Sequence, residues 1–167
     1  KEGDFLQYCG SEVHGNYSIA WSPDNTKIVY SSYREGNSDL FLIDIISCSE
    51  SQITTTSGNE NNPVWINGTI YYSYYESKFI EKVLREEISI KNYHIEEDIH
   101  STILTFDESI SVISPPLFAL MNGKILIKAS ISELNGGLFT YDPHEIILVR
   151  LLEINPWEHV NSMDWFR

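Results

Sequence analysis

Basic residues are scarce in this sequence. It contains 11 Lys and Arg against 24 Asp and Glu, its formal net charge is −13, and the basic residues form no run. Nucleic-acid binding depends on clustered Lys and Arg that neutralise phosphates. We therefore expect no nucleic-acid partner and no patch for an anionic membrane, whereas a cationic or neutral partner is compatible with the acidity.

Long apolar runs and cysteines are scarce too. No stretch approaches the ~18 consecutive apolar residues of a membrane-spanning helix, so membrane insertion is not expected. The only cysteines are Cys9 and Cys48, which lack C-x-x-C spacing and give a weak signal. Both lie near the ends of predicted strands, which leaves a disulfide and two free thiols as open alternatives.

The sequence also lacks a catalytic motif. It has no G-x-S-x-G nucleophile elbow, and the segment from Gly10 to Gly15 has the wrong spacing for one. Glycosidase chemistry needs two carboxylates that converge across a cleft, and a chain with 24 acids singles out no pair. We therefore predict no catalytic residue, no cofactor and no enzyme activity within these residues.

What recurs instead is an aromatic residue within a turn-forming block. The aromatic residues of the blocks are Trp21, Trp65, Phe118 and Trp165. They are separated by 44, 53 and 47 positions, near the ~40–50-residue period of four-stranded propeller blades. The spacing predicts an array of small β-sheets.

The first repeat resembles a known family. Its parts are Trp21-Ser22-Pro23-Asp24, an apolar strand at 27–32, Arg34-Glu35-Gly36-Asn37 and an apolar strand at 40–44. This order resembles the TolB-like (WD-like) β-propeller repeat, and the match is best over 16–54. Later copies are weaker, with Phe118 in place of Trp. The resemblance implies a β-propeller.

The expected fold is an all-β propeller segment of three four-stranded antiparallel blades, in a single domain over 1–167. The predicted blades span 16–55, 62–106 and 111–153, with partial-blade strands at 4–9 and 160–166. Closed propellers need ~4–8 blades. We therefore expect this chain to be part of a larger propeller or to self-associate.

Structural roles are predicted for the most regular positions of the repeat. Pro23 and Asp24 form a turn, because Pro fixes φ and Asp bonds back to the backbone. Gly36 and Asn37 supply the positive-φ positions of a hairpin. The recurring aromatic residues named above are predicted to lie in the core.

One segment of the second repeat is ambiguous. Residues 79–88 stand where the repeat requires its third strand, but Ile80, Val83, Leu84 and Ile88 also fit helical spacing. We favour a strand because the repeat requires one there.

A metal site is considered at residues 94–100. If this segment is one strand, His94, Glu96, Asp98 and His100 share a face, with neighbouring positions about 7 Å apart. A metal ion would need ligands from elsewhere as well. A solvated polar face is the favoured interpretation, so these residues are weak metal candidates.

The resemblance implies a non-catalytic protein-binding or scaffolding module located in the periplasm or at the cell surface. Its contacts would come from loops at one face of the ring, which in this chain include Tyr33, Arg34 and Glu35. Tyr and Trp are enriched in binding hot spots, so Tyr72, Tyr74 and Trp157 are further candidates.

Two alternatives remain. The chain could be the propeller domain of a larger serine peptidase of the prolyl-oligopeptidase type, whose catalytic domain lies elsewhere. It could also be a structural subunit that self-assembles through its open edges.

Overall fold

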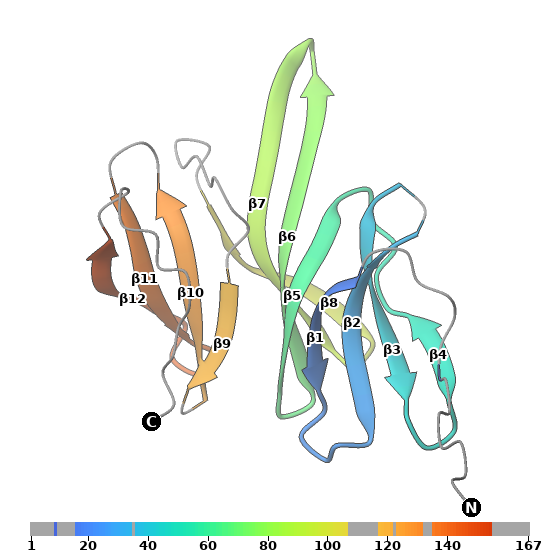
Figure 1. Cartoon of the computed structure of the whole chain (residues 1–167). Helices are drawn as coiled ribbons and strands as arrows, with labels where there is room; N and C mark the ends of the chain where they lie inside the picture. The colour runs from blue at the N-terminus through green and yellow to red at the C-terminus, as the bar shows by residue number, and fades with distance from the viewer. Residues whose placement is uncertain are drawn as a thin grey trace, which may run out of the picture. The chain divides into compact units, whose positions relative to one another are not determined.

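The computed structural model describes residue 9 and residues 16–34, 36–106, 117–121, 123–131 and 135–154. These residues form twelve strands and no helix (Figure 1). The strands are β1 Asn16–Trp21, β2 Lys27–Tyr33, β3 Ser38–Asp44, β4 Ser49–Gln52, β5 Asn59–Ile66, β6 Thr69–Ile80, β7 Val83–His94, β8 Ile99–Thr105, β9 Leu117–Met121, β10 Lys124–Ile131, β11 Asn135–Asp142 and β12 Ile147–Ile154.

The strands pair in chain order into three antiparallel four-stranded sheets, β1–β4, β5–β8 and β9–β12. The prediction of an all-β chain with four-stranded antiparallel sheets is therefore confirmed. The partial-blade strands at 4–9 and 160–166 lie outside the described residues, apart from Cys9. No helix of the described residues is long and apolar enough to cross a membrane.

The chain divides into two compact units. Residues 1–106 hold the first two sheets and residues 107–167 hold the third. Each unit is described by itself below, and the single-domain extent over 1–167 stays a prediction.

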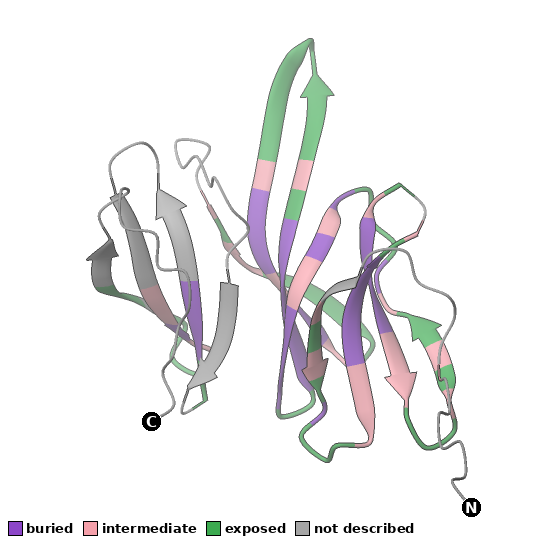
Figure 2. Cartoon of the chain, viewed as in Figure 1, coloured by how far each residue is buried: buried purple, intermediate pink, exposed green. Residues whose placement is uncertain are grey.

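The core of the first unit lies between its two sheets (Figure 2). Val29 and Leu40 of the first sheet pack with Trp65, Ile70 and Tyr72 of the second, and all five are buried. Successive side chains of a strand alternate between the two faces of a sheet. The inner strands of each sheet therefore turn an apolar face toward the neighbouring sheet.

The turn between the third and fourth strand of each sheet has one geometry. Its last residue has positive φ in all three sheets, at Cys48 (55°), Asp98 (55°) and Ile146 (56°). In each sheet the first residue of the second strand also bonds to the last residue of the third. These pairs are Lys27–Asp44 at 3.1 Å, Thr69–His94 at 3.1 Å and Lys124–Asp142 at 3.3 Å. The repeat therefore extends to the third sheet, where the sequence signal is weakest.

The prediction that Trp21 lies in the core is wrong, whereas Trp65 is buried. Their side chains are 49% and 8% exposed. Ala20 packs against the core, so Trp21, the next residue of β1, points to the opposite face of the sheet. Ile19 shares that face and is exposed as well. The side chain of Phe118, and Trp165, lie outside the described residues.

The β2–β3 hairpin departs from the prediction at one position. Gly36 has a φ of 103°, but Asn37 is not among the residues with positive φ. Asn37 instead donates from Nδ2 to the backbone oxygens of Thr56 and Gly58, at 2.8 and 2.7 Å. Its amide therefore ties the β2–β3 turn to the segment that enters the second sheet.

The ambiguous segment 79–88 is strand rather than helix, as predicted, but it is two strands. Ile80 ends β6, Val83 begins β7, and Glu81 and Lys82 form the turn with φ of 51° and 68°. Two successive positive φ values are the signature of a tight hairpin turn. The helix-like spacing of apolar residues thus comes from two strands on either side of a turn.

Residues 76–87 form a hairpin that extends beyond the rest of its sheet (Figure 1). We call it the β6–β7 arm. β5 pairs only with residues 69–75 of β6, and β8 pairs only with residues 89–94 of β7. The arm therefore consists of five residue pairs, from Glu76–Glu87 to Ile80–Val83, beside which no third strand of the described residues pairs.

Candidate functional site

Four exposed apolar side chains flank the Glu81–Lys82 turn at the tip of the β6–β7 arm. Phe79, the most exposed of its large side chains at 76%, pairs with Leu84, and Ile80 pairs with Val83. The two pairs occupy opposite faces of the hairpin, because successive side chains alternate. Both faces of the tip therefore present apolar surface.

Charged side chains occupy the base of the arm. Lys78 donates to Glu76 at 2.9 Å, and hydrogen bonds from Ser57 and then Lys78 lower the pKa of Glu76 to about 2. The hydroxyl of Tyr75 donates to Glu86 at 3.0 Å. The apolar tip thus stands on a polar base. The sequence analysis missed this surface because it assigned 79–88 to the interior of a blade.

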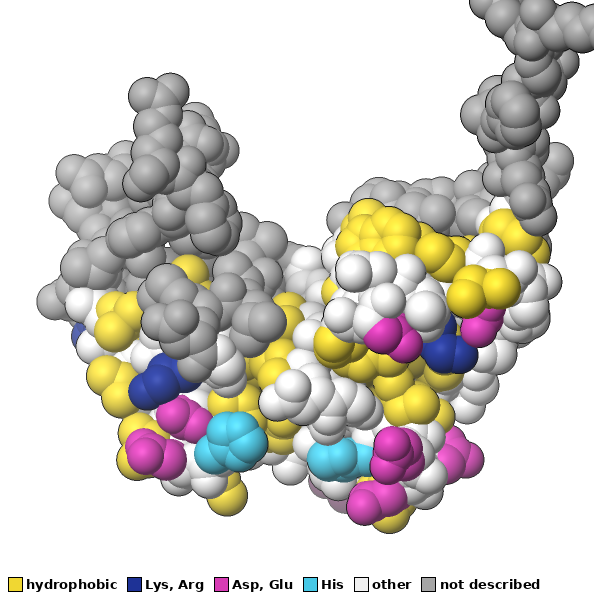
Figure 3. All heavy atoms as spheres, turned by 90° about the horizontal axis from the view of Figure 1, so that it is seen from below, with side chains coloured by type: hydrophobic (Ala, Val, Ile, Leu, Met, Phe, Trp, Pro, Cys, Tyr) yellow, Lys and Arg dark blue, Asp and Glu magenta, His cyan; other side chains and the backbone are white. Residues whose placement is uncertain are grey.

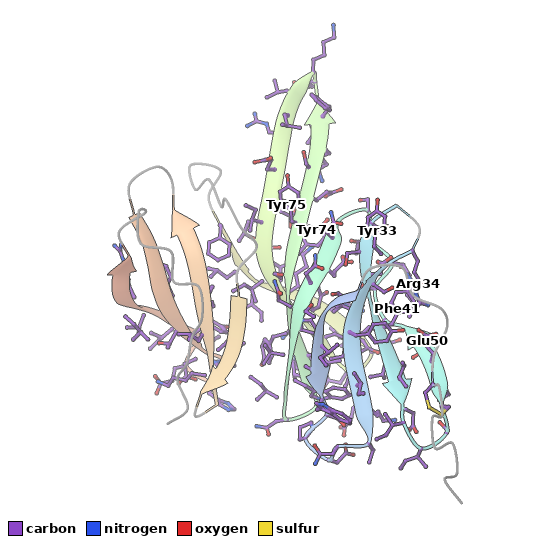
Figure 4. The ribbon with its side chains drawn as sticks, viewed as in Figure 1. Tyr33, Arg34, Phe41, Glu50, Tyr74 and Tyr75 are labelled. Carbon is purple, nitrogen blue, oxygen red and sulfur yellow. A yellow bond between two sulfur atoms is a disulfide. The ribbon has the colours of Figure 1, made fainter. Side chains whose placement is uncertain are left out.

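Tyr33 lies at the same end of the first unit as the arm (Figure 4). The β2–β3 pairing ends at Tyr33–Ser38, and the equivalent pair of the second sheet is Tyr75–Ile88, from which the arm continues. Tyr33 is exposed, and its hydroxyl donates to the backbone oxygen of Gly36 at 2.8 Å. The other predicted contacts Glu35 and Trp157 lie outside the described residues.

Arg34 is turned onto the first sheet and is not a free contact residue. Its guanidinium lies 3.8 Å from the centre of the Phe41 ring and donates from Nη2 to Glu50 at 2.5 Å (Figure 4). It also donates to the hydroxyl of Tyr30 at 2.7 Å. Burial, and then the Glu50 carboxylate, raise the pKa of Tyr30 to about 12. The side chain of Arg34 therefore stabilises its own sheet.

Tyr74 is buried, which corrects its prediction as an exposed contact. It is 4% exposed, and its hydroxyl donates to Glu76 at 2.9 Å. A Cβ on Gly58 would lie 2.3 Å from the Tyr74 ring, so only glycine fits at position 58. Tyr72 faces the same way and is buried too, whereas Tyr75 is 38% exposed. The Tyr run was assigned to the wrong faces because its register was not known.

The predicted shared face at 94–100 is also wrong, because residues 95–98 form a turn between β7 and β8. His94 pairs with Ile99, and His100 pairs with Tyr93, so the two histidines point to opposite faces. His100 stacks on the Tyr93 ring, with centroids 4.5 Å apart. Within the described residues, no three His, Cys, Asp or Glu side chains gather where they could hold a metal ion.

Seen from the end opposite the arm, the acidic side chains of the first unit are interspersed with basic, histidine and hydrophobic side chains (Figure 3). Asp24 accepts from the backbone N–H of Thr26 at 3.0 Å. Hydrogen bonds, first from the Ser47 backbone and then from Lys27, lower the pKa of Asp44 to about 2. Some carboxylates of the chain therefore accept hydrogen bonds from backbone N–H groups in its turns.

Two carboxyl groups are buried where the first two sheets meet. Glu60 is fully buried and Asp39 nearly so. Thr56 donates to Glu60, and Thr54 lies 3.4 Å from Asp39. Burial, together with the negative charge of Asp39, raises the pKa of Glu60 to about 7. Burial also raises the pKa of Asp39. Oε2 of Glu60 is buried and has no hydrogen-bond partner among the described residues.

A pocket of about 290 Å³ opens beside these carboxyl groups. It lies between the segment that links the two sheets and the outer strands of the second sheet. Its lining residues are Ile53, Thr54, Thr55, Thr56, Tyr72, Lys91, His100, Ser101 and Thr102. The sequence gives no signal for it, because its two walls lie about 40 residues apart in the chain.

Neither a protein-family model nor a curated protein sequence matches this chain. Solved structures do. TolB from Acinetobacter baumannii superposes with a TM-score of 0.62 at 15% identity, over 82% of this chain and 32% of the other. A structure assigned to TolB of Agrobacterium tumefaciens gives 0.64 at 17% identity, over 87% and 52%.

A puromycin-hydrolysing peptidase of Mycobacterium tuberculosis is similar as well, with a TM-score of 0.62 at 12% identity, over 87% of this chain and 23% of the peptidase. At sequence identities this low, the similarity is evidence for the fold alone. The chain has a TolB-like β-propeller fold and spans between about a third and a half of the TolB structures it matches.

Proposed function

We propose that this chain is a non-catalytic protein-binding module that contacts its partner through the β6–β7 arm. The observation that carries the proposal is the exposed apolar tip of the arm. Two-stranded hairpins are marginally stable in water, and exposed apolar side chains that gather in one place, here one pair on each face of the hairpin, mark interaction sites. Burying each large apolar side chain in an interface contributes ~1.5–3 kcal/mol, so the four tip residues form a small hot spot.

The surroundings of the arm extend the proposed surface. Tyr33 and Tyr75 are both exposed at this end of the first unit. Tyrosine combines a large apolar ring with a hydroxyl, and it is enriched in hot spots. Because the chain has a net charge of −13, a partner with a cationic or neutral surface would approach it more readily.

The disulfide favours an exported location for this module. Cys9 and Cys48 form a disulfide, and disulfides persist in oxidising compartments such as the periplasm and the cell surface. We therefore infer that the module works in one of these two places.

The proposal is tested by a matched pair of surface variants. One carries Phe79→Ser with Leu84→Ser in the arm, and the control carries Ile46→Ser at a turn residue of equal exposure, 77%. Proteins cross-linked to each variant in an exported fraction are identified by mass spectrometry, and the affinity of a purified partner is then measured. The arm variant should bind at least ten-fold more weakly than the control. Equal affinity of the two variants would contradict the proposal.

A second candidate is the propeller domain of a larger peptidase, which is favoured by the similarity to the puromycin-hydrolysing peptidase. The parent reading frame decides between the two. A G-x-S-x-G motif encoded beyond residue 167 would favour the peptidase, and its absence would favour the binding module.

A further inference from the structure

The chemistry of the pocket beside Glu60 distinguishes it from the rest of the chain. No Asp or Glu lines it, although the chain has 24 of them. Six of its nine lining residues carry hydroxyls, and the others are Ile53, Lys91 and His100. The residues that line this pocket therefore offer hydrogen-bond donors to an anionic group, and none of them carries a carboxylate.

Lys91 supplies the positive charge of the pocket. Its side chain is 19% exposed, and its ammonium lies 3.1 Å from the centre of the Tyr74 ring. The nearest acid is Glu87, at 3.6 Å, which is longer than a hydrogen bond. An ammonium has three N–H donors, and no described residue accepts one within hydrogen-bond distance. Lys91 forms an ion pair with Glu87, but at a distance that leaves its N–H groups able to donate to a further anionic oxygen.

The hydroxyls divide into two groups. Thr54 and Thr56 are engaged, because Thr54 accepts from the backbone N–H of Leu40 at 2.8 Å and Thr56 donates to Glu60. The Tyr72 hydroxyl is engaged too, 3.2 Å from Nδ1 of His100. The remaining hydroxyl residues of the lining are Thr55, Ser101 and Thr102, of which Thr102 shares the face of Lys91 and Ser101 occupies the opposite face of β8. They stand on both walls of the pocket.

His100 fixes the shape of the pocket. Its Nδ1 lies 3.2 Å from the hydroxyl of Tyr72, and its ring stacks on Tyr93. Burial lowers the pKa of His100 and disfavours its charged form. Lys91 is the one Lys or Arg among the residues that line the pocket, and a single ammonium matches a singly charged anion better than a doubly charged phosphate.

We propose that this pocket binds a carboxylate group, held by the Lys91 ammonium and by the hydroxyls of Thr55 and Thr102. The carboxylate belongs either to the C-terminus of a peptide or to a free small acid. Backbone and side-chain donors around one cation are a recurring way to capture a terminal carboxylate. The site touches the base of the arm through the Lys91–Glu87 ion pair, but the proposal does not rest on the function proposed for the arm.

The test uses the full chain and four probes: acetyl-Ala-Ala with a free carboxylate, the same peptide amidated, sodium propionate and inorganic phosphate. Amide chemical shifts of Thr55, Ser101 and Thr102 are followed by NMR during titration. Saturable shifts with the free peptide but not with the amidated peptide support the proposal. Propionate that binds as well as the peptide identifies a small acid as the source, and binding of the peptide alone identifies a C-terminus. Tighter binding of phosphate, or no saturable shift, overturns the proposal.

Variants of Lys91 separate charge from folding. Lys91→Met keeps the apolar stem over Tyr74 and should weaken carboxylate binding at least ten-fold, whereas Lys91→Arg should stay within a few-fold of the natural chain. Lys27→Met is the matched control, because Lys27 pairs with Asp44 on the first sheet away from the pocket. The Phe79→Ser, Leu84→Ser variant should bind carboxylate normally. Unchanged binding by Lys91→Met overturns the proposal.

Discussion

Ile146 has a backbone conformation that its side chain disfavours. Its φ is 56°, in the left-handed region that costs about 1–3 kcal/mol for residues other than Gly, Asn and Asp, and most for β-branched ones. The equivalent positions hold Cys48 and Asp98. The turn geometry, imposed by the pairing of the flanking strands, thus overrides the preference of the residue.

Ile146→Asn should therefore raise the free energy of unfolding by about 1 kcal/mol, measured by urea denaturation. The control is Ile46→Asn, at a turn residue of similar exposure that does not have positive φ. Equal effects of the two substitutions would show that φ at position 146 is not strained.

Glu60 makes stability depend on pH. Its pKa is about 7 in the folded chain against an ordinary value of 4.5, so between these values the folded state binds more protons than the unfolded state. The contribution of Glu60 to the free energy of unfolding is largest below about pH 4.5. It falls as the pH rises to about 7 and is constant above that.

The Glu60→Gln variant cannot ionise at this position. Relative to this variant, the natural chain should lose about 1–3 kcal/mol of unfolding free energy between pH 4.5 and pH 7.5. Urea denaturation of both proteins across this range measures the difference. A constant difference would mean that Glu60 is ionised throughout.

Sequence patterns predicted which segments form strands and turns better than they predicted which side chains are buried. Trp21 and Trp65 occur in similar blocks, yet only Trp65 has a second sheet against its face. Tyr74 and Tyr75 are neighbours of the same type, and a shift of one position in register exchanges their exposure. Burial depends on which sheet packs on which face, and that information is not local.

At the level of elements, the disulfide joins residue 9 to the β3–β4 turn. Cys9 and Cys48 are 39 residues apart, and closing a loop of this length stabilises a fold by about 2–4 kcal/mol in the chain-entropy model. Cys9→Ser with Cys48→Ser should lower the unfolding free energy by that amount in urea. An unchanged denaturation midpoint would contradict a stabilising bond.

The β6–β7 arm should be dispensable for folding. Its strand residues pair only with one another, and its bonds to the rest of the sheet come from side chains at its base, such as Ser57–Glu76 and Lys91–Glu87. Replacing residues 76–87 by the four residues of the β2–β3 turn, Arg-Glu-Gly-Asn, should therefore change the unfolding free energy by less than about 1 kcal/mol. Circular dichroism and thermal unfolding measure this. Loss of cooperative unfolding would show that the arm is part of the core instead.

The sequence could indicate strands at 79–88 but not an arm. Strand propensity marks Phe79, Ile80, Val83 and Leu84 as sheet residues, whereas Glu81 and Lys82 are not typical turn residues. The turn forms because strand pairing on either side brings these two residues together.

At the scale of the whole molecule, the period of the aromatic residues predicted three similar sheets. The third sheet has lost most of the motif, yet it keeps the Lys124–Asp142 pair and the positive φ at Ile146. Strand pairing and turn geometry thus persist where side-chain identity does not. The pocket and the buried carboxyl pair could not be predicted, because each joins segments from two sheets.

The mass of the protein in solution distinguishes a module that binds a different protein from a subunit that self-assembles. One chain has a mass of 19.2 kDa. We expect this monomeric mass by sedimentation at micromolar concentration, because the arm is proposed to bind another protein. A dimer or a larger assembly would favour self-assembly.

Hydrogen exchange of the arm tests the central proposal most directly. Residues 76–80 and 83–87 have edges with no neighbouring strand, so half of their amides should exchange rapidly in the free chain. When the cross-linked partner is purified and added back, these amides should become protected while those of β3 stay unchanged. An arm that exchanges equally fast with and without the partner would contradict the proposed binding surface.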